Sequence, residues 1–375
     1  MAKGERFPAE WSTFADAQTG AIVKQLTNYK GHSHHLYFTN SGWYSDAEGR
    51  KLLFGSDRCN LTNLFSLNLD SGEIRQLTER NVTNSQLLFT SINPRRAEAY
   101  FWHARTLIAL DLDTLKERPL YRVPDGYDLN ITSVTADGNF VCTGIYEDLS
   151  SRFKIDLLHG YVGFAEYWEA KPHSQILLIS TETGQAQVVF EERYWIGHAN
   201  ASPTQPDIAT YCHEGPWEKV DQRIWGLNLR TGESWKLRPT EVGEQVGHEY
   251  WLADGEHIGY HGRSADGQSF YGSVRYDNTE RIEATFPGES MHFQSNDLRL
   301  IVGDGTRNDP KLMVWRMGDG AFGEPRVVLT HHGTFQIQQL HVHPRFSPDG
   351  SQILFTSDMS GYGNLYLVDV PAWER

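Results

Sequence analysis

The chain has 375 residues, and its 34 Lys and Arg against 48 Asp and Glu give a formal net charge of −14. No apolar run in the sequence approaches the roughly 20 residues of a membrane-spanning helix, and an acidic chain without a Lys- or Arg-rich run is disfavoured as a nucleic-acid binder, because that binding depends largely on neutralising phosphates. The first residues show no apolar stretch behind their basic side chains, so we expect no signal peptide and a cytoplasmic location.

One strand is predicted at the start of the chain, over 21–27, and a repeated unit follows it. In each unit a turn precedes an apolar strand, and a loop then leads to an alternating strand, most clearly in the segments that begin at Glu48 and Asp349. Aligned on the first apolar residue after the turn, the units fall at Leu52, Ala99, Phe140, Ile208, Ile258, Leu300 and Ile353. Successive spacings of 47, 41, 68, 50, 42 and 53 residues are typical of four-stranded propeller blades, which take about 40–50 residues.

These seven units predict an all-β chain folded as a seven-bladed β-propeller. The long spacing requires an insertion, which the segment at about 150–175 supplies. The strand at 21–27 resembles the blade-ending segment near Gln76, so we expect it to complete the last blade and close the ring. No linker-like stretch divides the sequence, so 1–375 is predicted to be a single domain. A β-sandwich with insertions would not explain seven copies.

Histidines recur where the first strand of a blade is expected to begin. Three histidines stand 10 residues before the aligned residue of their unit, namely His198, His248 and His343. His292 stands 8 residues before the aligned residue of its unit. His34 belongs to the same group in the first unit, whose turn is longer. Because the first strands lie nearest the propeller axis, we expect these histidines to gather at one mouth of the central channel.

Other strand ends should bring charged and polar side chains to the same mouth. They include Arg58 in GSDR, His213 in CHEGP, Arg223 in DQRIW, and His261 with Arg263 in YHGR. The planar guanidinium of Arg223 suits a two-pronged contact with a carboxylate, although a salt bridge at a blade edge explains it equally well.

The motif Gln338-x-x-His341-x-His343, with His292 from the preceding blade, is the sharpest candidate site. Two imidazoles two residues apart are expected on the same side of one strand, and the Gln338 amide oxygen can supply a fourth ligand. No thiolate belongs to the group, which favours a divalent ion such as Mn²⁺, Fe²⁺, Ni²⁺ or Zn²⁺. Two ordinary strand histidines are the alternative, and the metal interpretation depends on the propeller register.

His248, in GHEYW, faces the same mouth in this interpretation. A neutral imidazole near pH 7 is a suitable general base. A structural histidine hydrogen-bonded to Glu249 or to a loop carbonyl is the alternative.

At these residues the sequence resembles the oligogalacturonate lyases, a family of polysaccharide lyases. The specific segments are CHEGP followed by V-D-x-R and a Trp, and Q-x-x-H-x-H-P before a turn; the region 125–173 matches poorly. The resemblance implies a seven-bladed propeller with a metal-assisted β-elimination site and Mn²⁺ as the expected ion. It also implies metal ligands at His292, Gln338, His341 and His343, a proton-abstracting base at His248 and a cationic stabiliser at Arg223.

From this resemblance we expect a lyase that cleaves short oligogalacturonides, namely digalacturonate and 4,5-unsaturated digalacturonate, to 5-keto-4-deoxyuronate in pectin degradation. His34, Arg58, His198 and His213 are candidates for contacts with substrate hydroxyls or a second carboxylate. A non-catalytic scaffold of the TolB type that binds a peptide or protein partner is the alternative, and it predicts no metal. A serine hydrolase with a propeller cap is disfavoured because the sequence has no GxSxG elbow.

Overall fold

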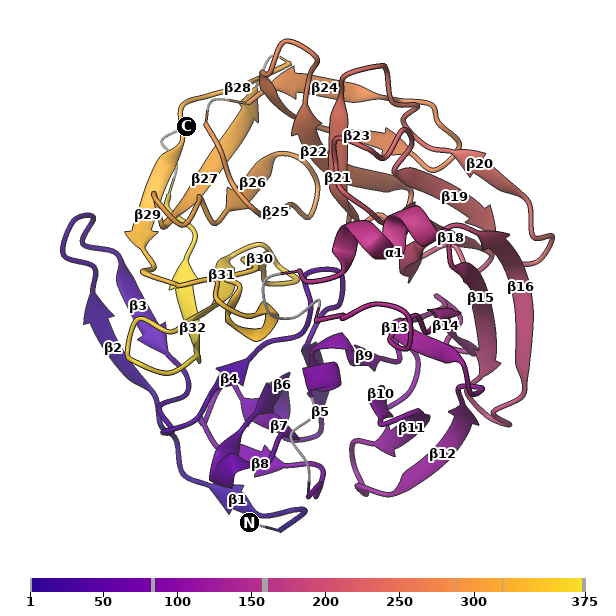
Figure 1. The fold of residues 1–375 in the computed structure, drawn as a ribbon. Coiled ribbons are helices and arrows are strands. Elements are labelled where there is room, and N and C mark those ends of the chain that lie inside the picture. Colours follow the sequence, from indigo (N-terminus) through magenta and orange to yellow (C-terminus); the bar gives the residue numbers. More distant parts are fainter. Residues whose placement is uncertain (1, 82–84, 157–160, 287, 319, 373–375) are drawn as a thin grey trace. The chain divides into compact units, whose positions relative to one another are not determined.

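The computed structural model describes residues 2–81, 85–156, 161–286, 288–318 and 320–372 (Figure 1). The chain divides into two compact units. Unit 1 comprises Met1–Leu88, Leu112–Leu115 and Pro287–Arg375, and unit 2 comprises Phe89–Asp111 and Lys116–Phe286. Among the helices of the described residues, none has both the length and the apolar character needed to cross a membrane.

Unit 1 contains three antiparallel sheets. The first sheet has the order β1 (Arg6–Phe7), β8 (Ile74–Gln76), β7 (Asn63–Asn68), β6 (Gly49–Ser56) and β4 (Ser33–His34), with β5 (Trp43–Asp46) also paired to β6. The second has the order β25 (Phe293–Gln294), β26 (Leu300–Gly303), β27 (Lys311–Gly318) and β28 (Ala321–Phe322), with β29 (Arg326–Thr330) also on β27. The third has the order β2 (Ser12–Ala15), β3 (Ile22–Gln25), β32 (Asn364–Asp369), β31 (Gln352–Ser357) and β30 (Arg345–Phe346).

Unit 2 contains four sheets, and in each of them the four strands are neighbours in chain order. They are formed by β9 (Ser91–Ile92), β10 (Glu98–His103), β11 (Thr106–Asp111) and β12 (Glu117–Arg122); by β13 (Tyr127–Val134), β14 (Phe140–Glu147), β15 (His173–Ser180) and β16 (Ala186–Arg193); by β17 (Ile196–Ala201), β18 (Ile208–His213), β19 (Ile224–Asn228) and β20 (Ser234–Lys236); and by β21 (Gln245–Trp251), β22 (His257–Arg263), β23 (Ser269–Arg275) and β24 (Ile282–Thr285). The helical segments of the chain are η1 (Arg58–Asn60), η2 (Ser85–Phe89), α1 (Phe164–Ala170) and η3 (Gln338–Leu340).

The seven sheets are the blades of a seven-bladed β-propeller, as the repeat predicted. Each aligned residue of the sequence repeat lies in the second strand of its blade, in β6, β10, β14, β18, β22, β26 and β31. The predicted pairing of the N-terminal strand is confirmed as well: β3 pairs antiparallel with β32, and Val23 stands opposite Val368 (Figure 1). The last blade is therefore built from both ends of the chain.

The predicted insertion at about 150–175 corresponds to the connection between β14 and β15, although residues 157–160 lie outside the described part. It contains α1 and an isolated bridge between Asp156 and Val162. Tyr167 of α1 is buried and stacks on Trp195, with 5.0 Å between the ring centroids. This small aromatic cluster attaches the insertion to unit 2. The single domain over 1–375 stays a prediction.

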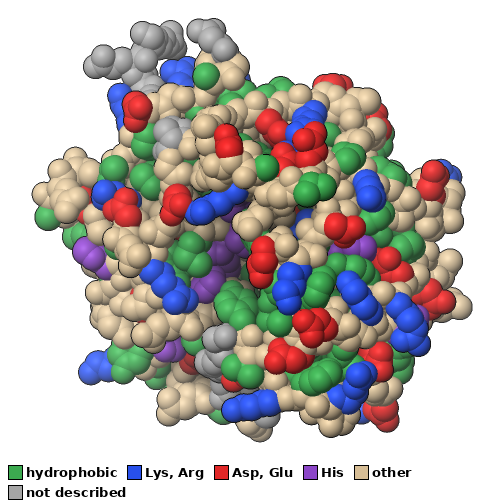
Figure 2. Space-filling view, turned by 45° about the horizontal axis from the view of Figure 1, so that its top comes forward, with side chains coloured by type: hydrophobic (Ala, Val, Ile, Leu, Met, Phe, Trp, Pro, Cys, Tyr) green, Lys and Arg blue, Asp and Glu red, His purple; other side chains and the backbone are tan. Residues whose placement is uncertain are grey.

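Apolar side chains on alternate strand positions pack the blades of each unit against their neighbours. In unit 1, Val314 of β27 and Phe355 of β31 belong to one buried cluster, and in unit 2, Cys142 of β14 and Tyr211 of β18 belong to another. Figure 2 shows acidic and basic side chains interspersed across one face of the molecule. On this face, acidic and basic side chains of the described residues are therefore mixed and form no separate acidic and basic regions. Buried charged groups form the clusters of the candidate site.

Candidate active site

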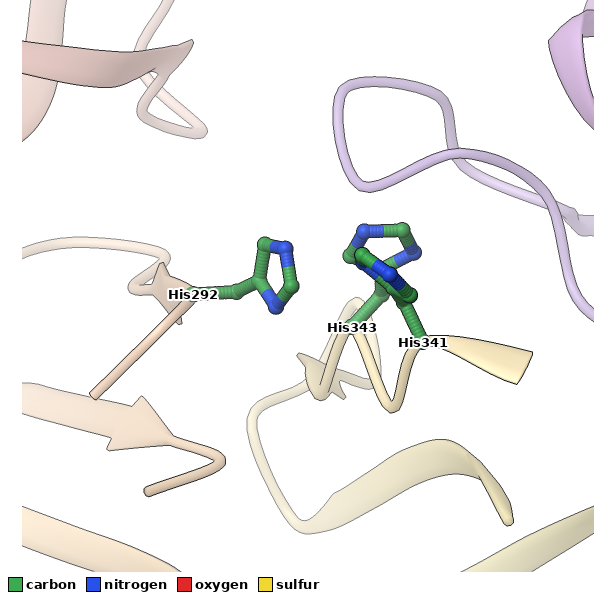
Figure 3. Close-up of side chains that lie close together, drawn as sticks. All are labelled: His292, His341 and His343. Carbon is green, nitrogen blue, oxygen red and sulfur yellow. The ribbon is translucent and has the colours of Figure 1, made fainter. Parts of the chain in front are cut away.

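Three buried histidines of unit 1 face one another (Figure 3). His292, His341 and His343 are 4%, 5% and 1% exposed, and one ligand atom from each lies within 4.8 Å of the others. The ring centroids are separated by 4.2 Å between His292 and His343, 5.3 Å between His292 and His341, and 5.4 Å between His341 and His343. Three of the four predicted metal ligands therefore form one cluster, which we name the histidine triad.

The local backbone of the triad differs from the prediction. The expectation that His341 and His343 share one face of a strand is wrong, because neither residue lies in a strand. His341 follows η3 in an extended conformation, and His343 adopts a left-handed backbone with φ 43°. Left-handed residues other than glycine are uncommon and strained, and they persist where surrounding contacts hold them.

His35 supplies one such contact. Its Nε2–H donates to the backbone carbonyl of His343 at 2.8 Å, and its Nδ1 lies 2.6 Å from Thr356 Oγ1. Burial lowers the pKa of His35 to about 3, so the ring is neutral and Nδ1 accepts from the hydroxyl. No feature of the sequence indicated this role for His35, which directly follows the predicted site residue His34.

Asp304 orients the first member of the triad. Its Oδ2 accepts a hydrogen bond from His292 Nδ1 at 2.6 Å, and its Oδ1 accepts from the His292 backbone N–H at 2.8 Å. Burial alone would raise the pKa of Asp304, but the adjacent His292 outweighs burial and lowers that pKa. A carboxylate behind a ligating imidazole selects the tautomer whose Nε2 can bind a metal. Asp304 was not among the predicted site residues, and nothing in the sequence indicated this contact.

Two unsatisfied polar atoms, one in the triad and one in the preceding η3, fit a metal site. Within the described residues, Gln338 Oε1 and His341 Nδ1 are buried and have no hydrogen-bond partner, which costs about 1–3 kcal/mol for each such group. Burial, followed by the nearby His292, lowers the pKa of His341 to about 3, so the ring is neutral and able to act as a ligand. Three imidazoles and an amide oxygen form a donor set that suits a divalent transition metal.

Arg223 lies in a buried ion-pair network of unit 2. It is 5% exposed, and its Nη1 and Nη2 donate to the two carboxylate oxygens of Glu214 at 3.2 and 3.3 Å. Its Nε is 3.5 Å from Oε2 of Glu249, a fully buried carboxylate whose Oε1 lies 3.0 Å from His198 Nδ1. The two-pronged contact that the sequence suggested for a ligand is thus made with Glu214. All three arginine contacts exceed the 2.7–2.9 Å typical of strong charge-assisted hydrogen bonds.

The same network shows why a second metal site is disfavoured. His198, Cys212 and Glu249 have the proximity of a ligand group, but the Arg223 guanidinium lies beside them. Burial raises the pKa of Cys212 well above its ordinary value, so no thiolate is available. Burial alone would raise the pKa of Glu249, yet Arg223 and then His198 lower it to about 2. We interpret the group as an ion-pair network.

His248 and His198 occupy matching β-bulges. The register against the neighbouring strand shifts between Gly247 and Tyr250 in β21 and between Gly197 and Asn200 in β17. Within these bulges, His248 has φ 49° and His198 has φ 46°. A bulge redirects a side chain out of the regular alternation of its strand, and bulges are common beside active sites. Both histidines therefore occupy the same position in the first strand of their blades.

The half-buried His248 ring contacts a second imidazole. Its Nδ1 lies 3.0 Å from Nε2 of His261, and both rings contact Trp217, with centroid distances of 5.3 and 5.8 Å. Glu249, the partner considered from the sequence, instead contacts His198 and Arg223. The sequence predicted His261 at the same mouth without a specific role. No sequence signal indicated Trp217.

The remaining predicted substrate contacts are all strongly buried. Arg58 is 2% exposed, and both of its terminal nitrogens donate to Glu10, at 2.6 and 2.8 Å. His34 is 1% exposed, and its Nδ1 donates to the His35 carbonyl at 3.1 Å. These contacts support a structural role for both residues. His213 stacks on Tyr194 at 3.8 Å between centroids, and its Nε2 lies 2.8 Å from Glu192 Oε1.

Comparisons with known proteins agree with this fold. Residues 1–373 match the model of a family described as oligogalacturonate lyase. An oligogalacturonide lyase of Pectobacterium atrosepticum and an oligogalacturonate lyase of Dickeya dadantii are each 31% identical to this chain, with 99% of both chains covered.

Two solved structures are also similar over 99% of each chain. An oligogalacturonate lyase in complex with manganese is 30% identical with a TM-score of 0.89, and the oligogalacturonate lyase of Vibrio parahaemolyticus is 27% identical with a TM-score of 0.87. Sequence and fold therefore agree over nearly the whole length. The chain belongs to the oligogalacturonate lyase family and is a polysaccharide lyase.

Proposed function

We propose that this lyase cleaves digalacturonate and 4,5-unsaturated digalacturonate by metal-assisted β-elimination, yielding 5-keto-4-deoxyuronate in pectin degradation. The observation that carries the proposal is the buried histidine triad, with Asp304 behind His292 and the unsatisfied Gln338 Oε1 in the η3 segment that precedes His341. The manganese in a family member that is 30% identical supports Mn²⁺ as the ion. His292, Gln338, His341 and His343 would hold it.

The donor set suits an acidic substrate. Three imidazoles and an amide carry no negative charge, so they would leave the charge of a bound divalent ion unquenched, and such an ion would supply Lewis-acid stabilisation of the negative charge that develops on the uronate carboxylate. The C5 proton of a 4-linked galacturonide lies next to that carboxylate and is acidified by it. The chemistry of the site and the reaction of the family are therefore compatible.

His248 is proposed as the base that removes the C5 proton. The C5–H bond breaks, its electron pair forms the C4=C5 double bond, and the C4–O bond breaks as the leaving oxygen takes up a proton. The strained bulge that positions His248 and its half-buried ring support this role. A positioned general base typically contributes about 10²–10⁴-fold to the rate.

Arg223 is proposed as the cationic group that stabilises the developing charge. Its contacts to Glu214 and Glu249 are longer than strong charge-assisted hydrogen bonds. The guanidinium can therefore still form a stronger hydrogen bond with a substrate carboxylate. His198 and His213 stay proposed substrate contacts. Arg58 and His34 also stay proposed substrate contacts, although Glu10 pairs with the Arg58 guanidinium and both side chains are buried.

Chelation and metal replacement test the proposal directly. The protein is dialysed against chelator, Mn²⁺ is added back, and ultraviolet absorbance is followed with digalacturonate and with its unsaturated analogue. Elimination creates a conjugated double bond, whereas hydrolysis does not. With digalacturonate we expect metal to restore a rise in absorbance, which lasts until the unsaturated monouronate opens to its isomer 5-keto-4-deoxyuronate. With the unsaturated substrate we expect loss of the band when it is split. No change with either substrate, together with no retained metal, would overturn the proposal.

A further inference from the structure

His248 and His261 come together through neighbouring strands of one blade. His261 lies in β22 and stands directly opposite Gly247 of β21, the residue before His248. The bulge after Gly247 turns His248 back toward this neighbour, which brings its Nδ1 to 3.0 Å from His261 Nε2. The contact is therefore built by the strand register and does not depend on a loop.

Trp217 fixes the two rings in place. Its indole contacts both imidazoles, at 72° to His248 and 51° to His261. A Cβ on Gly247 would lie only 2.7 Å from Trp217 Cζ2, so the absent side chain at 247 leaves room for the indole. The packing around the pair thus holds one relative orientation of the two imidazoles.

The proton on this hydrogen bond decides which nitrogen of His248 can act as a base. If His261 donates, the neutral His248 ring carries its proton on Nε2 and has no basic nitrogen directed away from the pair. If His248 Nδ1–H donates, His261 Nε2 accepts, and Nε2 of His248 keeps its lone pair. Only the second arrangement allows His248 to abstract a proton through Nε2.

We propose that His261 is a positioning residue, which accepts a hydrogen bond from His248 Nδ1 and thereby holds His248 in its basic tautomer. The inference rests on the proposed role of His248 as the base. In this pair the His261 imidazole has the orienting role that a carboxylate often has beside a basic histidine. When His248 takes up the substrate proton, the same hydrogen bond is strengthened by the positive charge, which favours proton removal.

Two amide substitutions, whose oxygen atoms extend to different distances from the backbone, separate the effect of the hydrogen bond from the effect of packing. In His261→Gln the amide oxygen extends about as far as imidazole Nε2, whereas in His261→Asn it reaches only about as far as Nδ1. We expect Mn²⁺-loaded His261→Gln to keep kcat within about threefold of the unsubstituted enzyme and His261→Asn to lose about tenfold or more, the scale of one net hydrogen bond. KM should stay within about twofold in both.

His257→Gln is the matched control. His257 lies in the same strand, where its Nδ1 pairs with Asp254 at 2.7 Å, and it is outside the proposed machinery. It should leave kcat unchanged. Thermal unfolding and metal content of each variant show whether the fold and the triad survive.

Nitrogen NMR of ¹⁵N-histidine-labelled protein gives a readout that does not depend on activity. With Zn²⁺ in place of paramagnetic Mn²⁺, His248 should be protonated on Nδ1 in the unsubstituted protein and in His261→Gln, and shifted toward the Nε2–H tautomer in His261→Asn. The His248 signals are assigned by their loss in His248→Gln.

The outcomes distinguish the two proposals. A predominant Nε2–H tautomer of His248 in the unsubstituted protein, or equal kcat in the Gln and Asn variants, would overturn the positioning role of His261. Full turnover in His248→Gln would instead refute the base assignment, while the tautomer measurement would still decide whether His261 sets the hydrogen bond.

Discussion

Asp304→Asn should weaken metal binding without removing any metal ligand. In the native site, Asp304 Oδ2 accepts from His292 Nδ1 at 2.6 Å, while Oδ1 accepts from the His292 backbone N–H at 2.8 Å and from Ser290 Oγ at 3.0 Å. An asparagine has only one accepting oxygen for these two positions. If the NH₂ group faces His292 Nδ1, two donors meet, and the ring is driven toward the Nε2–H tautomer.

The size of the effect follows from the loss of that orienting contact. Partners behind a ligating histidine typically contribute 10–100-fold to metal affinity, which corresponds to about 1.4–2.7 kcal/mol. The reverse orientation of the amide is also unfavourable, because its NH₂ group then faces the His292 backbone N–H, and two donors again meet. We therefore expect Mn²⁺ to bind at least tenfold more weakly, and activity at limiting Mn²⁺ to fall in parallel.

Competition with a fluorescent chelator measures the Mn²⁺ affinity, and circular dichroism checks the fold. Asp309→Asn is the matched control, since Asp309 is exposed and contacts Lys311 at 2.8 Å. An Mn²⁺ affinity of folded Asp304→Asn within about twofold of the unsubstituted protein would refute the reasoning, because the carboxylate would then not set the His292 tautomer.

Three further predictions concern the other parts of the site. His341→Ala should lose metal and activity together, whereas His248→Ala should keep metal and lose about 10²-fold or more in kcat; near-normal turnover in His248→Ala would remove it from the mechanism. Arg223→Lys should lower kcat and the unfolding temperature, because a point charge does not reproduce the fork that spans Glu214 and Glu249; unchanged values of both would contradict this. The pKa of Glu249 in the folded protein is about 2, against an ordinary 4.5. The Glu249 carboxylate therefore stabilises the folded state above pH 4.5. This stabilisation is lost as pH falls toward 2, by up to about 1.4 kcal/mol per pH unit. Acid unfolding should accordingly be shallower in Glu249→Gln, and an unchanged acid transition would exclude Glu249 as its source.

Much of the fold could be predicted because each blade carries its own local signals. A turn, an apolar strand and an alternating strand recur within one unit, so their spacing alone locates the second strand of all seven blades. The pairing of β3 with β32 was also predictable, because the N-terminal strand has the pattern of a blade-ending strand and lacks a blade of its own. These properties depend on neighbouring residues, which the sequence records directly.

The histidine triad was predictable as a set of residues but not as a geometry. The repeat placed His292 and His343 at equivalent blade positions, and the QxxHxH motif supplied His341 and Gln338. The prediction that His341 and His343 converge because they alternate along one strand was wrong. The left-handed backbone at His343 is instead held by His35, more than 300 residues earlier in the chain. Spacing within a motif cannot report a backbone conformation that a distant side chain stabilises.

The sequence by itself determined the residue types available for metal binding and for proton transfer, and it determined the strand pattern that gathers them. Only the tertiary structure decided their partners: Asp304 for His292, Glu214 for Arg223, and His261 for His248. The physical reason is that hydrogen bonds and buried ion pairs act over about 3 Å, so which tautomer or charge a side chain carries depends on contacts that arise only when separate strands pack together.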